Sequence, residues 1–516
     1  MSFRRGVAWL LAFVTAGSVL AIAASTAPVV AQDGRTLTIG LGGETTTLNA
    51  NIGQGGGGAL GISVFEAMYN NLLSIDPRGR LLPELATEYR VLEDKLTWQF
   101  KLRQGVRFHN GEELTAESVK TTLDDIITST IAVSNVKRRM AQVERVDIVD
   151  RYTVNVKTKI PFVLLPKGLA DAFIYPARYY RETGPDAFSD KPSGTGQFRF
   201  VEWRKGISIT LARNPAYWGP KATIDRVVFR PFPESAARIA ALERGEIDIA
   251  ANVPPDDAQR LRAKGFNIVF SPLGQAMLVQ LVPVRGTPLE DRRVRQALNF
   301  AIDKNALVEA IMGGYTKVLR GQLVGPDGFG YNPLLVPYPY DPAKARALLA
   351  QAGYPNGFSI RMQCSQGRYV KQKEVCEAVV GQLAKVAVRV DLEMSEWGTF
   401  INRILTNAPD RAPMWYLGLN YFPAMDAEFI IQHYITASPL RQFSHPRLDE
   451  LYRLQAQEFD TARRLKLIQE FMDVVREEAP NVFLFQAPAI YALNKRVQGF
   501  TPTPDDAIRL DGVSFK

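Results

Sequence analysis

The chain has 516 residues, of which 46% are hydrophobic and 22% charged, and its formal net charge is +9 at pH 7. This length exceeds what one hydrophobic core usually serves and indicates two or more domains. The charges are dispersed, without a block of five or six like charges, which argues against a nucleic-acid-binding protein.

The first 31 residues have the pattern of a secretory signal peptide. Arg4 and Arg5 precede an apolar stretch at 7–24, and a small-residue cleavage site ends at Ala31. The apolar stretch is long enough to span a bilayer, so an uncleaved anchor is the alternative. We expect cleavage before Gln32, which leaves a soluble periplasmic chain with a net charge of +9 − 2 = +7.

A glycine-rich segment at 39–61 overlaps the end of a strand-like run, "TLTIGL". It is not a P-loop, because no Lys-Ser/Thr pair follows its last glycine. The dinucleotide-binding fingerprint fails as well, since Thr45 stands where the third glycine belongs. Two interpretations remain: a mobile surface loop, or a backbone that comes close to a ligand.

Strands and helices intermix along the rest of the chain, which indicates an α/β architecture. The clearest helix spans 341–353, where Asp341 caps the first turn, Pro342 takes the first helical position and Gly353 ends the helix. Further helices are predicted over 288–314 and from about residue 460 to just before Pro480. β-Branched and aromatic residues predict strands at 96–102, 152–158, 207–212, 227–231, 276–282, 388–394, 413–419 and 481–486.

Catalytic signatures are scarce. The three histidines, His109, His433 and His445, form no H-E-x-x-H motif, and there is no C-x-x-C. Ser134 and Lys137 match the S-x-x-K motif of exported penicillin-binding enzymes, but the accompanying S-D-N and K-T-G motifs are absent. An exported hydrolase is kept as an alternative.

Aromatic side chains gather near the ends of two predicted strands. Trp397 follows one of them, and Trp415 and Tyr416 lie in the other. They either pack in the core or form a pocket wall at the strand ends, where α/β proteins place ligands.

The chain has two cysteines, Cys364 and Cys376. In an exported protein they can pair. Spacing alone does not give their geometry, so a disulfide and two free thiols both remain open.

Several stretches together resemble the extracellular solute-binding proteins of ABC importers, in the branch of dipeptide-, oligopeptide- and nickel-binding proteins. The similarity runs from about Leu37 to about Phe500. In "PSGTGQFRFVEW" (192–203), Gln197 and Phe198 replace the family's Pro-Tyr. The other stretches are 81–120, 213–219, 241–250, 291–303 and 340–358.

This resemblance implies an α/β fold of two lobes, a periplasmic-binding-protein-like clamp (type II, cluster C) with an extra subdomain in the first lobe. Two strands would cross between the lobes, which agrees with the absence of a linker. The implied boundaries are 1–31 for the signal peptide, 32–70 with 194–271 and 487–516 for the core of the first lobe, 71–193 for the extra subdomain, and 272–486 for the inserted second lobe.

The resemblance also implies a ligand site between the lobes. Glu44, Thr45 and Thr46 would face the ligand from the loop after the first strand. Across the cleft, Trp397 would form a wall, and Arg368 would hold a ligand carboxylate in a bidentate fork.

The strand at 413–419 and the segment after it would add further ligand contacts from Trp415, Asn420 and Tyr421. Peptide-binding members carry an aspartate just after this strand, which binds the peptide's α-amine, whereas this chain has a phenylalanine there. Asp426 is the nearest acid downstream. Either a local shift brings Asp426 to the amine, or this protein does not recognise a free α-amine.

The implied function is to capture a small solute, foremost a peptide or peptide-like compound, by hinge closure and to deliver it to an inner-membrane ABC permease with its ATPase subunits. The resemblance implies a monomer that binds no nucleic acid, needs no cofactor, holds no metal of its own and is no enzyme. Opines, oligosaccharides and chelated nickel remain open as ligands. A sensor or chaperone is a further alternative class.

Overall fold

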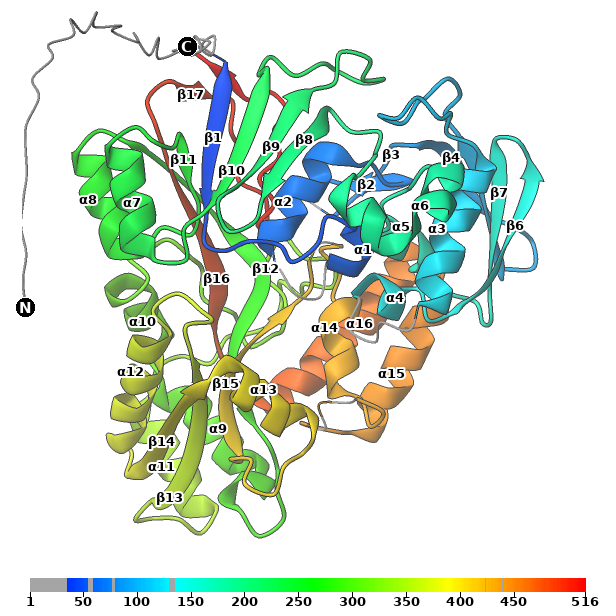
Figure 1. Cartoon of the computed structure of the whole chain (residues 1–516). Coiled ribbons are helices and arrows are strands. Elements are labelled where there is room, and N and C mark those ends of the chain that lie inside the picture. The colour runs from blue at the N-terminus through cyan, green and yellow to red at the C-terminus, as the bar shows by residue number, and fades with distance from the viewer. Residues whose placement is uncertain are drawn as a thin grey trace, which may run out of the picture. The chain divides into compact units, whose positions relative to one another are not determined.

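The computed structural model describes residues 35–53, 59–76, 79–129, 135–422, 424–438, 440 and 442–516 (Figure 1). The predicted signal peptide, the later part of the glycine-rich segment and Ser134 lie outside these residues. Within the described ranges, no helix is both long and apolar enough to cross a membrane.

The largest sheet has ten strands and mixes parallel with antiparallel pairs. Across the sheet their order is β14 (Val388–Glu396), β13 (Phe358–Gln366), β15 (Met414–Asn420), β12 (Asn267–Leu281), β16 (Asn481–Leu493), β11 (Ile249–Ala250), β1 (Thr36–Leu41), β10 (Arg226–Pro231), β9 (Ser208–Arg213) and β8 (Phe198–Arg204). We call β13 to β15 the β14 half of the sheet, and β1 with β8 to β11 the β8 half.

Two long strands, β12 and β16, join the two halves in the middle of the sheet (Figure 1). They pair antiparallel from Asn267↔Leu493 to Gln280↔Asn481, with a register shift between Pro272 and Ala276. Beyond the shift β12 also pairs with β15, whereas the end of β16 pairs with β11. All thirteen residues of β16 are buried, which explains its nearly continuous apolar sequence.

The predicted strands at 276–282 and 481–486 are confirmed, but they cover only parts of β12 and β16. Pro272 and Pro488 fall in the remaining parts, and the structure places them opposite each other. Neither has an N–H for the ladder, so this pair of prolines stands directly beside the register shift. A proline usually argues against a central strand, so the two strands predicted from the sequence leave these prolines out.

A second sheet of four antiparallel strands has its own hydrophobic core. Its strands are, in order, β4 (Ala86–Val91), β5 (Thr97–Leu102), β7 (Thr153–Thr158) and β6 (Val143–Asp150), and helix α3 (Ala116–Thr128) packs on it. Trp98, Phe100 and Leu123 are buried in this core. It corresponds to the extra subdomain that the resemblance implies, and all the domain boundaries, 71–193 included, stay predictions.

The β14 half carries most of the long helices. They are α9 (Arg292–Ala301), α10 (Lys304–Ala310), α11 (Pro342–Gln351), α12 (Gln372–Ala384), α13 (Trp397–Leu405), α15 (Pro446–Gln457) and α16 (Thr461–Glu478). The start of α11 is confirmed, since Asp341 accepts a hydrogen bond from the Lys344 N–H at 2.9 Å. The single helix predicted over 288–314 is wrong, because Asp303 caps a new helix there and accepts from the Ala306 N–H at 3.0 Å.

The remaining elements lie outside the β14 half or are short. They are helices α1 (Ala50–Gly53), α2 (Ala59–Met68), α4 (Asn135–Arg139), α5 (Leu165–Leu169), α6 (Ala177–Asp190), α7 (Ser235–Glu243), α8 (Pro255–Ala263) and α14 (Glu428–Ile431), 3₁₀ turns at Pro288–Glu290 and Gln432–Tyr434, and strands β2 (Leu73–Ile75), β3 (Leu81–Pro83), β17 (Val497–Gln498) and β18 (Ser514–Phe515). After β16 the chain returns to the β8 half, where Arg509 pairs with Glu66 of α2 at 3.2 Å.

Candidate ligand-binding site

A cavity of about 450 Å³, the main cavity, lies where three parts of the chain meet. Arg139 and Phe162 line it from the extra subdomain. Asn420 and Phe422 line it from the end of β15, and Glu428 lines it from α14. Its volume falls in the range of ordinary small-molecule sites.

Two further cavities adjoin the main cavity. The inner cavity, about 100 Å³, lies against β12 and β16, and the outer cavity, about 900 Å³, lies between the α7–α8 region and the start of α12. Arg368 and Tyr369 line all three cavities. These two residues therefore stand at the junction of the whole site.

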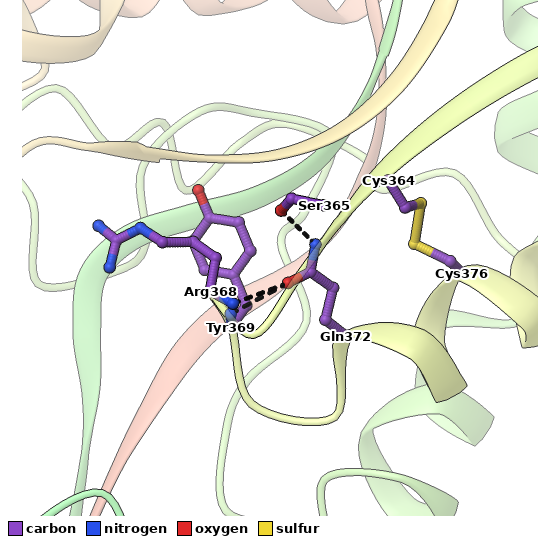
Figure 2. The surroundings of a disulfide bond; sticks show 6 residues. All are labelled: Cys364, Ser365, Arg368, Tyr369, Gln372 and Cys376. Carbon is purple, nitrogen blue, oxygen red and sulfur yellow. Dashed lines mark hydrogen bonds between the residues drawn. A yellow bond between two sulfur atoms is a disulfide. The ribbon is translucent and has the colours of Figure 1, made fainter. Parts of the chain in front are cut away.

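The loop that carries Arg368 and Tyr369 is fixed at its base. A disulfide joins Cys364 of β13 to Cys376 of α12, as Figure 2 shows. The Gln372 side chain accepts hydrogen bonds from the backbone N–H groups of Arg368 and Tyr369, at 3.3 and 3.1 Å. The cysteine pairing that the sequence left open is thus present, and it closes the loop around the junction of the cavities.

We expect the double variant Cys364→Ala, Cys376→Ala to lose about 3 kcal/mol of unfolding free energy, because the crosslink between residues 12 apart restricts the unfolded chain. Ligand affinity should fall as well, because the opened loop holds Arg368 less firmly. Denaturant unfolding of the oxidised parent and the double variant measures the first effect, and calorimetric titration the second. A double variant as stable as the oxidised parent contradicts this expectation.

Arg368 is exposed, and its guanidinium lies over the rings of Trp397 and Tyr369, 5.2 and 5.5 Å from their centroids. The two rings meet edge to face at 6.2 Å. Among the described residues, no carboxylate lies within ion-pair distance of Arg368. The aromatic rings hold a cation in place without neutralising it, which suits the binding of a ligand anion.

Three of the predicted site residues, Arg368, Trp397 and Asn420, line the same main cavity. Asn420 is exposed at the end of β15 and accepts a hydrogen bond from the Gln275 amide at 2.5 Å. Phe422 lines the cavity too, so an apolar ring stands where the resemblance implies an aspartate for peptide amines.

Asp426 does not reach the cavity, and its prediction as a ligand contact is corrected. It is completely buried, with Arg464 in a bidentate pair at 2.7 and 2.8 Å and Lys167 at 2.9 Å. Burial alone would raise its pKa, but the two cations outweigh this effect and hold the pKa of the carboxyl well below its usual range. Because Lys167 belongs to the extra subdomain, Asp426 ties that subdomain to the β14 half.

Trp415 and Tyr421 are also corrected, since both are completely buried in the core. Trp415 is the second residue of β15, a strand that lies between β12 and β13. The Tyr421 hydroxyl accepts hydrogen bonds from the Gly325 N–H and the Gln486 amide, both at 2.9 Å. Neither side chain lines any of the three cavities.

The structure does not bring Glu44, Thr45 and Thr46 together with Arg368. The Glu44 carboxylate accepts from the Trp203 indole at 2.6 Å and from the Gly206 N–H at 2.8 Å. Thr45 is buried and Thr46 is exposed, and none of the three lines the main, inner or outer cavity. The geometry gives no support to a ligand contact from these three side chains, although Gly42 of the same segment lines the outer cavity.

Several cavity residues were not predicted from the sequence. Glu428 is buried in the wall of the main cavity beside Tyr452, and the Gln455 amide donates to it. Burial raises the pKa of Glu428 to about 8. Arg139 and Asp506 were missed for the same reason: each comes from a segment far along the chain from Arg368, and no local motif marks it.

A sheet whose halves share two long strands, with connected cavities between the parts, defines a two-lobed clamp that binds small solutes. A family model described as "Bacterial extracellular solute-binding proteins, family 5 Middle" matches residues 80–433. The chain belongs to this family, and it is the solute-binding component of an ABC importer.

The similarity to known relatives extends over almost the whole chain. The glutathione-binding protein GsiB of Pectobacterium atrosepticum is 30% identical over 473 residues, which are 87% of this chain and 88% of GsiB. HbpA2 from Haemophilus parasuis has a TM-score of 0.81 and 26% identity, covering 93% of this chain and all of HbpA2. AgaA from A. tumefaciens R10, solved with agropinic acid, has a TM-score of 0.76 and 27% identity, covering 93% of this chain and 99% of AgaA.

Proposed function

We propose that this chain captures a peptide-like solute with a free carboxylate in the periplasm and delivers it to an inner-membrane permease. The observation that carries the proposal is Arg368, an exposed arginine held over two aromatic rings at the junction of three cavities. Its planar fork matches the two oxygens of a carboxylate.

Glutathione is the first ligand to test. The relative GsiB, which is 30% identical, is a glutathione-binding protein. Glutathione has two carboxylates, a free amine and two peptide-type bonds, so it suits both an arginine and the polar side chains of Asn420 and Gln275 in the main cavity.

Agropinic acid is the second candidate, because the relative AgaA was solved with it. Nickel receives less support from this chain. No cluster of three or more His, Cys, Asp or Glu side chains suited to a metal ion occurs among the described residues.

We further propose that residues 1–31 direct export and are removed, that the mature protein works as a monomer, and that it carries out no catalysis. The hydrolase alternative has little support, since Lys137 of the S-x-x-K match donates to the Ser129 carbonyl. Incubation of the protein with glutathione, followed by mass spectrometry, tests for catalysis and should return the tripeptide intact.

We also propose residues 272–486 as the second lobe, bounded by the paired parts of β12 and β16.

The first test is thermal unfolding of residues 32–516 with glutathione, N-acetylglutathione, di- to tetrapeptides and agropinic acid. A ligand at a hundred times its Kd should add about 2.7 kcal/mol of stability. Stabilisation by glutathione or a peptide supports the proposal. Stabilisation by agropinic acid alone supports the second candidate, and no response to any panel member contradicts both.

The variant Trp397→Ala should bind glutathione at least about ten-fold more weakly while keeping its fold, because the ring both lines the main cavity and supports Arg368. Trp397 is only half-buried at the start of α13, so its loss leaves no closed cavity in the core. Calorimetric titration and circular dichroism measure the two effects. Parent-like affinity in the variant would place the ligand elsewhere.

A further inference from the structure

The inner cavity brings together residues from parts of the chain that lie far apart in sequence. Asp506 lines it from the C-terminal segment, Asn252 from the residues after β11, and Gln275 from β12. Arg368 and Tyr369 line it from the loop between β13 and α12, which Figure 2 shows. A carboxylate and a guanidinium thus face one small cavity from the two halves of the fold.

Asp506 is held firmly at this position. Its Oδ1 accepts a hydrogen bond from the Tyr491 hydroxyl at 2.6 Å, and no described residue donates a hydrogen bond to its Oδ2. The preceding Asp505 is buried and pairs with Arg509, whose guanidinium also pairs with Glu66 of α2. The C-terminal segment therefore presents one carboxylate oxygen from a fixed backbone.

Two of the residues that line this cavity have left-handed backbones. Asp506 has φ +61° and Asn252 has φ +52°. Aspartate and asparagine adopt this region more readily than other residues that have a side chain. The backbone conformation therefore suits the residue types at both positions, and an asparagine at position 506 would keep it.

We propose that the inner cavity binds the α-amino-acid head group of the ligand, with the Asp506 carboxylate accepting hydrogen bonds from the ammonium and the Arg368 guanidinium donating to the carboxylate. This inference rests on the proposed function and narrows it to ligands that carry both charges on one carbon. Such a ligand is a γ-glutamyl compound such as glutathione, or an amino-acid derivative. An ordinary peptide carries its ammonium and its terminal carboxylate at opposite ends.

The sizes and connections of the cavities agree with this arrangement. The inner cavity, at about 100 Å³, is smaller than ordinary ligand sites and admits only a small group. It shares Gln275, Arg368 and Tyr369 with the main cavity, so the rest of the ligand extends there, beside Asn420 and Trp397. Asp506 then supplies the acid that Phe422 does not.

The test compares Asp506→Asn with the parent in calorimetric titrations with glutathione and N-acetylglutathione. Asparagine keeps the shape, tolerates the left-handed backbone and still accepts from Tyr491, so the variant should fold. We expect Asp506→Asn to bind glutathione roughly ten- to a hundred-fold more weakly than the parent does. The parent should discriminate against N-acetylglutathione by a similar factor, and the variant should not.

A matched control is Asp147→Asn, which removes an exposed acid on β6 that lines none of the three cavities, and which should bind glutathione as the parent does. Parent-like affinity in Asp506→Asn, or equal discrimination by parent and variant, overturns the inference and leaves the proposed function standing. A parent that binds neither glutathione nor any peptide of the panel overturns both.

The pH dependence gives a second readout. Burial raises the pKa of Asp506 to about 6, against the lowering effects of the Tyr491 hydroxyl and the Arg368 charge, while Asp505 raises it further. Only the ionised carboxylate attracts an ammonium, so parent affinity should fall as the pH drops through 6. In Asp506→Asn this fall should disappear, and a fall of the same size in the variant would overturn the inference.

Discussion

We expect the variant Asp426→Ala to lose about 3–5 kcal/mol of unfolding free energy. Asp426 is completely buried, and its partners Lys167 and Arg464 have side chains only 15% and 6% exposed. Removing the carboxylate leaves two cations covered without a counter-charge. Urea unfolding, followed by tryptophan fluorescence and by circular dichroism, measures the loss.

Two further variants sharpen this result. Glu88→Ala breaks the exposed ion pair with Lys101 on the four-stranded sheet and should leave stability unchanged within error. Lys167→Met leaves the Arg464–Asp426 pair intact and should lose less than Asp426→Ala. Stability of Asp426→Ala within error of the parent would mean that the buried triad contributes nothing to folding.

The second large effect is on binding. We expect Arg368→Ala to weaken glutathione binding roughly a hundred-fold, because two hydrogen bonds to a carboxylate together contribute about 3 kcal/mol or more, and each 1.4 kcal/mol is a factor of ten. The ligand-free variant should be as stable as the parent, since Arg368 is exposed and makes no ion pair with a described residue. Calorimetric titration and thermal unfolding separate the two quantities.

Arg368→Lys should fall between parent and alanine variant, because lysine keeps the charge but lacks the fork. Arg90→Ala, on the four-stranded sheet, removes an exposed arginine away from the cavities and should not affect binding. If Arg368→Ala binds within three-fold of the parent, on the order of experimental scatter, the ligand carboxylate lies somewhere else.

Several helix ends were predictable because their signals are local, whereas the two-lobed arrangement came from the family resemblance. The Asp341 cap, the start at Pro342 and the end of α16 before Pro480 each act within one helical turn, and the structure confirms them. The full lengths of β12 and β16 were not predictable. Pro272 and Pro488 predict a break in each strand, and only the structure shows that the two prolines lie opposite each other in the strand pair.

The site was less predictable, because burial and partners decide what a side chain can do. Asp426 and Asp506 look alike in the sequence. In the structure one is neutralised by Lys167 and Arg464, whereas the other faces a cavity opposite Arg368. Trp415 and Trp397 differ in the same way, since the first lies inside a central strand and the second starts a helix at the cavity wall.

The covered disulfide has a consequence for the proposed binding of glutathione. Glutathione is a thiol, and its thiolate can attack a disulfide only by reaching one of the two sulfur atoms. Cys364 and Cys376 are both 0% exposed, so the cargo can exchange with them only after the surrounding loop opens locally. Under the proposed function, the rate at which this loop opens locally therefore limits how fast bound glutathione can reduce the disulfide.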